Sequence, residues 1–414
     1  MQAHKFPVPI DEREDPAESA TTASELRAVN AQLAMEELEI NVLDSLTPVE
    51  LAWREIEGDD LNSLHQSYDW CMSWTRSYGY PLSILWGRFG EKTAFILPVE
   101  INRFHGCRTA RFIGADHSNI NTGLFTPRFI EVINVLGPQK LAEMLRSALS
   151  GRADLLLLQN IPLEWRGRRN PLALLPMVQN QNHAYQLPLL ENMESTLQQV
   201  NAKHRRKKFR MQLRRFEALG GFDYASGGTS DEQHWLLDRF FELKGERFKA
   251  LGLPDVFEDP KTRAFLHAAL DIRHPDGQTT GLEMHAIRLK GDYDGHIAAV
   301  AGISRKGDHI ICQFSAIDES LVAETSPGEF LFWQMIEGQH GKGVALFDFG
   351  LGDQRYKRSW APVETEHYDA VLPLSLRGRV GGLVHRAITR GKAFIKSRPR
   401  IYHPAQRIRR VIGV

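Results

Sequence analysis

Apolar positions along the first half of the chain fall into runs whose spacing predicts a mixed α/β fold. Short alternating or continuous apolar runs are typical of strands, and apolar residues three and four apart are typical of helices. The run Asp-Leu-Leu-Leu-Leu-Gln at 154–159 is typical of a buried strand. In chain order the pattern predicts a strand at 38–43, helices at 48–56 and 66–78, strands at 82–89, 93–102 and 108–114, a helix at 138–149 and a strand at 154–159.

The second half repeats this order of elements without a residue-level repeat. Thr229 and Glu232 have the spacing of a capping box, which predicts the start of a helix. The predicted elements are a helix at 194–219, a strand at 222–225, helices at 229–251 and 261–272, strands at 282–290, 296–305 and 309–316, a helix at 326–340, and strands at 344–349 and 368–374.

The repeated order predicts two domains, each built on one mixed sheet. The chain has 414 residues, which is long enough for two domains. An antiparallel meander followed by a helical crossover to a further strand gives a sheet with both strand directions. We expect a polar, acidic tail at 1–36, an N-terminal domain at 37–186, a C-terminal domain at 187–375 and a basic tail at 376–414.

Composition and charge are those of an ordinary globular protein. Hydrophobic residues make up 42% of the chain and the formal net charge is zero, so no whole-protein attraction to nucleic acid is expected. Cys71, Cys107 and Cys312 lie far apart without C-x-x-C spacing, which indicates a reducing compartment. No apolar run approaches the roughly 18 residues that span a bilayer, and residues 1–20 lack the apolar segment of a signal peptide. We therefore expect a cytoplasmic protein.

Three stretches carry a family resemblance: K-H-R-R-K-K-F-R with L-R-R at 203–215, F-E-L-K-G-E-R-F at 241–248, and S-P-G-E-F-L, F-D-F-G-L-G-D and Y-K-R-S-W between 326 and 360. Through them residues 187–374 resemble the GNAT-like acyltransferase domain associated with bacterial cellulose and exopolysaccharide synthesis, and are distantly similar to Fem-type peptidyltransferases. The resemblance implies two tandem GNAT folds, the first diverged. It also implies transfer of an acyl group from acyl-CoA, such as acetyl-CoA, to an amine or hydroxyl of a small-molecule or saccharide acceptor.

The helix start at Ser326 is the candidate donor site. Ser326, Pro327 and Glu329 together fit an N-cap, a proline in the first turn and a capping box. A helix N-terminus presents free N–H groups to a pyrophosphate, and Gly328 lets a ligand approach the backbone. An ordinary capped helix fits the same residues. The chain lacks the phosphate loop Q/R-x-x-G-x-G/A that GNAT enzymes usually carry.

The stretch from Asp348 to Lys357 is the candidate catalytic site. It follows a predicted strand end, where open α/β sheets bind ligands. Acyl transfer to an amine needs a base, an acid for the leaving thiolate and donors for the oxyanion. We expect Asp353 to orient or deprotonate the acceptor, Tyr356 to protonate the leaving group, and Lys357 to hold a phosphate or the oxyanion. A structural turn capped by Asp348 is the alternative interpretation.

Four further residues are candidates for substrate binding. They are Arg206 and Arg210 on the basic helix, Asp348, and Glu283, which alternates with His285 on one strand. The basic helix fits a solvated face, an anionic-substrate site or a tRNA contact. The histidines show neither H-E-x-x-H nor zinc-ligand spacing, so no metal is expected.

The C-terminal tail predicts a basic amphipathic helix. Apolar residues from Val380 to Ile395 recur at helical spacing among Lys and Arg, and no Asp or Glu follows Asp369. Such a helix lies on an anionic membrane or packs on its own domain. We expect a cytoplasmic protein with possible peripheral contact at the inner membrane through this tail.

Three functions fit the sequence. The first is an acyl-CoA-dependent transferase of exopolysaccharide, cellulose or cell-envelope biosynthesis. The second is a Fem-like transferase that uses aminoacyl-tRNA, although nucleic acid is the less favoured partner. The third is a non-catalytic GNAT scaffold in a polysaccharide-synthesis complex. A pocket lined by Asp353, Tyr356 and Lys357 would disfavour the third.

Overall fold

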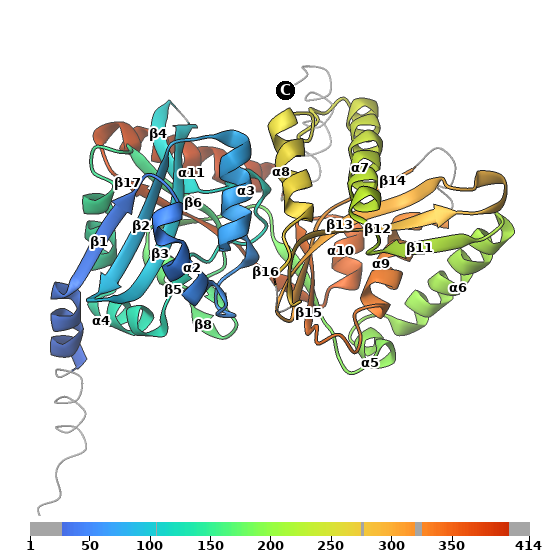
Figure 1. Cartoon of the computed structure of the whole chain (residues 1–414), viewed down its shortest axis with the longest axis horizontal. Coiled ribbons are helices and arrows are strands. Elements are labelled where there is room, and N and C mark those ends of the chain that lie inside the picture. The colour runs from blue at the N-terminus through green and yellow to red at the C-terminus, as the bar shows by residue number, and fades with distance from the viewer. Residues whose placement is uncertain (1–26, 105, 275–276, 319–324, 397–414) are drawn as a thin grey trace, which may run out of the picture.

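Two mixed sheets with the same strand order form the framework of the protein. The computed structural model describes residues 27–104, 106–274, 277–318 and 325–396, and the statements below concern these residues. The sheets lie side by side, with helices packed on each (Figure 1). The sequence prediction of a mixed α/β fold with two similar halves is confirmed.

The first sheet has seven strands in one path and one short strand beside it. Its path is β1 (Leu38–Leu43), β2 (Leu82–Phe89), β3 (Lys92–Phe104), β4 (Cys107–Phe112), β6 (Leu155–Ile161), β17 (Tyr368–Pro373) and β9 (Met177–Gln179), and β5 (Leu124–Phe125) pairs with β3. β4 and β6 are parallel, and the other neighbours are antiparallel.

The second sheet repeats this arrangement strand for strand. Its path is β11 (Phe222–Ser226), β12 (Thr279–Leu289), β13 (Ile297–Lys306), β14 (His309–Ile317), β15 (Leu346–Leu351), β10 (Ala184–Pro188) and β16 (Val363–Thr365). β14 and β15 are the parallel pair, at the position that β4 and β6 occupy in the first sheet. A separate hairpin pairs β7 (Glu164–Trp165) with β8 (Arg168–Arg169).

Each sheet takes its sixth strand from the other half of the chain. β10 follows the first half in sequence but pairs with β15 of the second sheet. β17 follows the second half but pairs with β6 of the first sheet. The sequence expectation placed 184–186 in the first domain and 368–374 in the second, so the structure reverses both assignments. The exchange ties the two domains together through two chain crossings.

The helices cover the sheets at the positions that apolar spacing predicts, with some changes of boundary. They are residues 27–36, α2 (Glu50–Glu57), α3 (Tyr68–Tyr78), α4 (Pro127–Ala148), α5 (Met193–Gln198), α6 (Ala202–Ala218), α7 (Ser230–Leu251), α8 (Pro260–Leu270), α9 (Pro327–Glu337), α10 (Arg355–Trp360) and α11 (Leu376–Lys396). Within the described ranges, no helix has the length and apolar character needed to cross a membrane.

Three expectations about helices are wrong in part. The predicted helix at 194–219 is two helices, because the Asn201 side chain accepts the His204 N–H and starts α6 afresh. The helix predicted from residue 138 begins at Pro127, with a kink at Gly137, whose φ is 82°. The predicted tail is helical over 27–36 and buries Ala31, Ala34 and Met35 in the first core; residues 1–26 lie outside the described residues.

One apolar core spans both domains. Trp70 and Trp74 of α3 pack edge-on against Phe265 of α8, with ring centroids 5.0 and 5.1 Å apart. Phe240 of α7 stacks on Phe314 of β14 within the same cluster. Burial of large aromatic surfaces is a strong source of stability, so the two domains are held as one unit.

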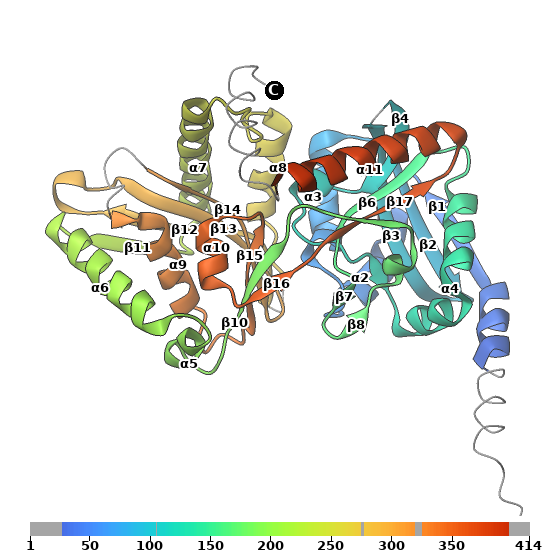
Figure 2. The same ribbon diagram turned by 180° about the vertical axis from the view of Figure 1, so that it is seen from behind.

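α11 belongs to the first domain, where it crosses the sheet beside β17 and β6 (Figure 2). Gly378 lets it approach closely, since a Cβ at this position would lie 1.6 Å from the Asp154 carbonyl oxygen. The alternative that the predicted amphipathic helix packs on its own protein is therefore realised for residues 376–396. Residues 397–414 of the predicted tail lie outside the described residues.

We expect Gly378→Ala to lower the free energy of unfolding, because the added methyl group forces α11 away from backbone that cannot yield. Overpacking of this kind typically costs about 1–3 kcal/mol. Gly391→Ala in the same helix is the matched control, because no atom lies within 4 Å of its Cβ position. It should stabilise by up to ~1 kcal/mol through helix propensity. Urea denaturation of both variants measures the difference, and equal stabilities would contradict the packing described here.

Candidate functional site

The parallel strands β14 and β15 part after a short paired segment. They pair only where His309–Ile311 meets Leu346–Asp348, and β14 then continues to Ile317. β15 ends in a turn at Gly350, whose φ is 70°; a Cβ there would lie 2.7 Å from the Cys312 carbonyl oxygen. The positive φ and the close approach to β14 both require glycine at this position. Backbone groups of β14 beyond the paired segment have no β15 partner.

Side chains of the helices α7, α9 and α10 surround the point where β14 and β15 part. Lys244 of α7 donates to the Ser315 carbonyl oxygen of β14 at 3.0 Å. Tyr356 of α10 stacks on Phe332 of α9, with ring centroids 5.2 Å apart. Burial raises the pKa of Tyr356, and burial raises the pKa of the Cys312 thiol to about 11. At neutral pH the site therefore holds a protonated phenol and an un-ionised thiol.

Lys357 is a buried cation that holds the end of β15. Its Nζ donates to the carbonyl oxygens of Gly350 and Leu351 at 3.1 and 2.6 Å. Burial lowers its pKa to about 8, although the nearby Asp348 carboxylate opposes this shift. Lys357 and Lys244 both act electrostatically on Cys312, so two cationic side chains flank the parting of the strands.

A cavity of about 860 Å³ lies between the two domains and reaches this point. Gln313 and Phe314 of β14 and Leu351 of β15 form part of its wall. Asn119 of the first domain donates to the Gln313 side-chain oxygen at 2.6 Å and accepts the Leu351 N–H at 3.1 Å. The first domain thus contacts the strand ends directly across the cavity.

Amides and aromatic rings dominate the wall of this interdomain cavity. The aromatic residues offer flat apolar faces, and the amides offer both donors and acceptors. The amide-bearing residues are Asn119, Gln159, Asn160, Asn180, Gln181, Asn182 and Gln313, and the aromatic residues include Trp70, Tyr78, Tyr80 and His117. Arg111, Asp116, Asp255 and Asp259 also line the cavity. Such a wall suits a polar ligand that carries hydroxyl or amide groups.

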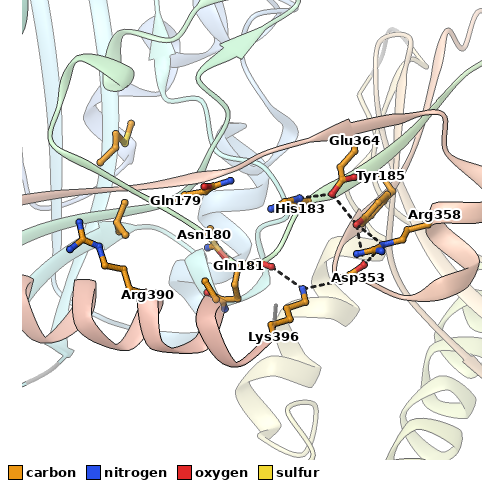
Figure 3. A pocket seen from close by; sticks show the side chains of 13 residues that line it. Gln179, Asn180, Gln181, His183, Tyr185, Asp353, Arg358, Glu364, Arg390 and Lys396 are labelled. Atoms are coloured by element: carbon orange, nitrogen blue, oxygen red, sulfur yellow. Dashed lines mark hydrogen bonds and ion pairs between the residues drawn. The ribbon is translucent and has the colours of Figure 1, made fainter. Parts of the chain in front are cut away.

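Asp353 lines a second cavity, of about 570 Å³, between α10, α11 and the segment before β10 (Figure 3). Its carboxylate pairs with Arg358, accepts from the Tyr185 hydroxyl at 3.1 Å and lies 3.6 Å from Lys396. Burial alone would raise the pKa of Asp353, but Arg358, Lys396 and Tyr185 hold it below its ordinary value. The two cavities share Asn180 and Gln181, so they adjoin.

The three predicted catalytic residues therefore lie in three different environments. Tyr356 packs on α9 beside the parting strands, Lys357 bonds the end of β15, and Asp353 faces the second cavity. Of the three residues, Asp353 lines the second cavity, and neither Tyr356 nor Lys357 lines that cavity or the interdomain cavity. Their roles in the reaction stay predictions.

The predicted capping box at the start of α9 does not form. Ser326 adopts a left-handed backbone with φ 53° and makes no side-chain cap. Glu329 instead reaches α6, where it lies 2.6 Å from Lys208 and 3.4 Å from Arg205. The attraction of two cations outweighs a single bond to a backbone N–H. The helix start still places Gly328 beside Ile317, just past the open part of β14.

The other substrate-binding candidates lie outside both cavities. Asp348 is buried, where it accepts the Gly350 N–H at 2.7 Å and a Gln186 amide N–H at 2.8 Å, which favours the turn-capping interpretation. Glu283 pairs with His285 at 3.2 Å. Arg206 pairs with Glu194, and the Arg210 side chain is exposed on α6.

Part of the chain is similar to a known protein family. Residues 203–358 match the family model described as an acetyltransferase (GNAT) domain. These residues are similar to that family and adopt a GNAT-type fold. This segment, called the GNAT domain below, contains most of α6 and α10, all of α7 to α9, and the parting strands, together with Lys244, Tyr356 and Lys357. No curated protein sequence matches the chain.

Three solved structures are similar to the chain at low sequence identity. FemX superposes with a TM-score of 0.56 at 12% identity, covering 81% of this chain and 97% of FemX. A C-terminal domain of a putative lysylphosphatidylglycerol synthetase from Agrobacterium fabrum gives 0.49 at 12% identity, over 82% and 95%. A tandem GNAT protein from the clavulanic acid pathway gives 0.42 at 12% identity, over 81% and 98%. The expectation of two GNAT folds is confirmed, and such low identities show fold alone.

Sequence analysis missed Lys244, Gln313 and Asn119. Lys244 lies within F-E-L-K-G-E-R-F, one of the stretches that carry the family resemblance, so it was open to discovery. Gln313 and Asn119 carry no comparable signal, because the cavity they share is built by two domains far apart in sequence.

We expect Lys357→Met to reduce the rise of stability with pH between about pH 8 and the ordinary lysine value of 10.5. In that window the unfolded chain binds a proton at Lys357 that the folded chain has lost, so stability rises with pH. Removing the ammonium removes this contribution. Urea denaturation across the pH range measures the slope. Exposed Lys207→Met controls for loss of one charge, and an equal slope in wild type and Lys357→Met would contradict the burial of Lys357.

Proposed function

We propose that the protein transfers an acyl group from acyl-CoA to an amine or hydroxyl of a polar acceptor, such as a saccharide. One observation carries the proposal: the interdomain cavity reaches β14 and β15 where the two strands part. A donor lying along the open edge of β14 would present its acyl group to an acceptor held in the cavity. Exopolysaccharide or cell-envelope biosynthesis is the process we expect to use this reaction.

The chemistry requires a proton for the leaving thiolate and positive charge near the oxyanion. Tyr356 is protonated at neutral pH, as tyrosine ordinarily is, and burial raises its pKa further. The phenol therefore has a proton to give to the leaving thiolate. Lys244 and Lys357 supply positive charge on either side of the parting strands. Fixed charges in a site of low dielectric stabilise a developing anion strongly. Asp353, in the adjoining cavity, is proposed to orient the acceptor.

The donor's phosphates are proposed to lie near the start of α9. The first turn of α9, which contains Gly328, is the positive end of the helix and favours an anion. Lys208 and Arg205 of α6 bring two cations to the same helix start through Glu329. A bound pyrophosphate would compete with Glu329 for these cations.

We expect Tyr356→Phe to lower the rate of acyl transfer by ~10²–10⁴, the usual loss for one general acid, while acyl-CoA affinity stays near that of wild type. Native mass spectrometry with a panel of acyl-CoAs identifies the donor, and release of free thiol in the presence of oligosaccharide acceptors measures the rate. Tyr293→Phe, on an exposed turn far from the site in sequence, is the control. Full activity in Tyr356→Phe would remove the phenol from the mechanism.

An aminoacyl-tRNA donor is the second candidate, and one observation favours it. The outward face of α6 carries the exposed cations Lys203, Lys207, Arg210 and Arg214. A row of exposed cations is the usual contact for a phosphate backbone. Strongly salt-dependent binding of bulk tRNA, together with no mass shift from any acyl-CoA, would favour this donor over CoA. A scaffold without catalysis would bind neither.

A further inference from the structure

α11 is built with its small residues facing inward. Gly378, Gly381, Gly382, His385 and Thr389 are buried against the first sheet. The helix comes close enough that a Cβ on Gly382 would lie 3.1 Å from a Val371 methyl group. Glycine lowers the stability of a helix. Its presence on this face is therefore explained by the close approach of α11 to the sheet.

The opposite face of α11 is apolar and exposed. Leu376 is 75% exposed, Leu383 65% and Val380 63%. Helical spacing puts these residues on one stripe. The rest of the stripe is Val384, Ile388, Phe394 and Ile395, each at least 36% exposed. This is the reverse of an ordinary surface helix, which turns its apolar residues toward the core.

Positive charge surrounds the stripe. Arg377, Arg379, Arg390 and Lys392 are exposed on the same helix. No acidic residue follows Asp369 in the sequence. A contiguous exposed apolar surface of this kind marks an interaction site.

We propose that the outward face of α11, defined by the apolar stripe and its flanking Arg and Lys residues, docks on an anionic lipid bilayer. An amphipathic helix at a bilayer buries its apolar face among acyl chains and places its cations at the phosphates. Lys and Arg residues close to an anionic surface are attracted to its phosphates. A symmetric dimer through α11 would instead oppose the cations of one copy with those of the other. An anionic bilayer can bury the apolar stripe and also pair with the flanking cations.

Docking in this way would bring the second cavity close to the lipid surface. Arg390, Ala393 and Lys396 of α11 line that cavity opposite Asp353. The same helix therefore touches both the proposed membrane and a cavity that adjoins the acceptor site. An acceptor attached to the membrane would be within reach of the GNAT domain.

Flotation of the full chain with lipid vesicles tests the proposal. We expect binding to vesicles of equal parts phosphatidylglycerol and phosphatidylcholine, and little binding to phosphatidylcholine alone. Because burial of an apolar side chain contributes about 1.5–3 kcal/mol, the double variant Val380→Ser/Leu383→Ser should bind at least about tenfold more weakly. The double variant Arg377→Gln/Arg379→Gln removes two cations, so it should bind more weakly, and its binding should depend less on salt concentration.

Leu51→Ser is the matched control, because Leu51 is 83% exposed on α2, outside the stripe. It should bind vesicles as wild type does, and circular dichroism should show all variants folded. Absence of binding to the anionic vesicles overturns the proposal, as does unchanged binding in the stripe variant. A dimer that the stripe variant converts to a monomer, without lipid binding, assigns the surface to a second copy instead.

Discussion

The reciprocal exchange of sixth strands is the constraint on which the rest of the structure depends. β10 completes the second sheet and β17 completes the first, so neither sheet is whole without the other half. An open edge next to β6 or β15 would leave backbone N–H and C=O groups unpaired and able to pair with another chain, which favours aggregation. The exchange therefore obliges the domains to lie together, and their contact creates the interdomain cavity.

The two halves share a strand order but differ in the side chains around their parallel strands. Both sheets contain a parallel pair at the same position, β4 with β6 and β14 with β15. The second pair is flanked by a buried phenol, Tyr356, and by two cations with lowered pKa values, Lys244 and Lys357. The first domain supplies Asn119 and the aromatic wall of the cavity. We interpret the first half as the acceptor side and the GNAT domain as the donor side.

Much of the fold was predictable, since strands 38–43 and 82–89 have the observed ends of β1 and β2. Each of these strands is long enough for its own pattern of apolar residues to predict it. β9, β10 and β16 were missed because three to five residues show no clear period. The capping box at Ser326 failed because cations from α6 capture Glu329, a contact that no local pattern predicts. Likewise, the cavity depends on partners more than 190 residues apart, such as Asn119 and Gln313.

The central claim is that the acyl donor lies where β14 and β15 part. A CoA thioester with a photoreactive diazirine in its acyl chain tests it most directly, with the modified peptides mapped by mass spectrometry. The account predicts labelling within residues 309–317 and 346–360, lost when excess unlabelled acyl-CoA competes. Labelling confined to the outward faces of α6 or α11, or labelling that competitor does not displace, would contradict it.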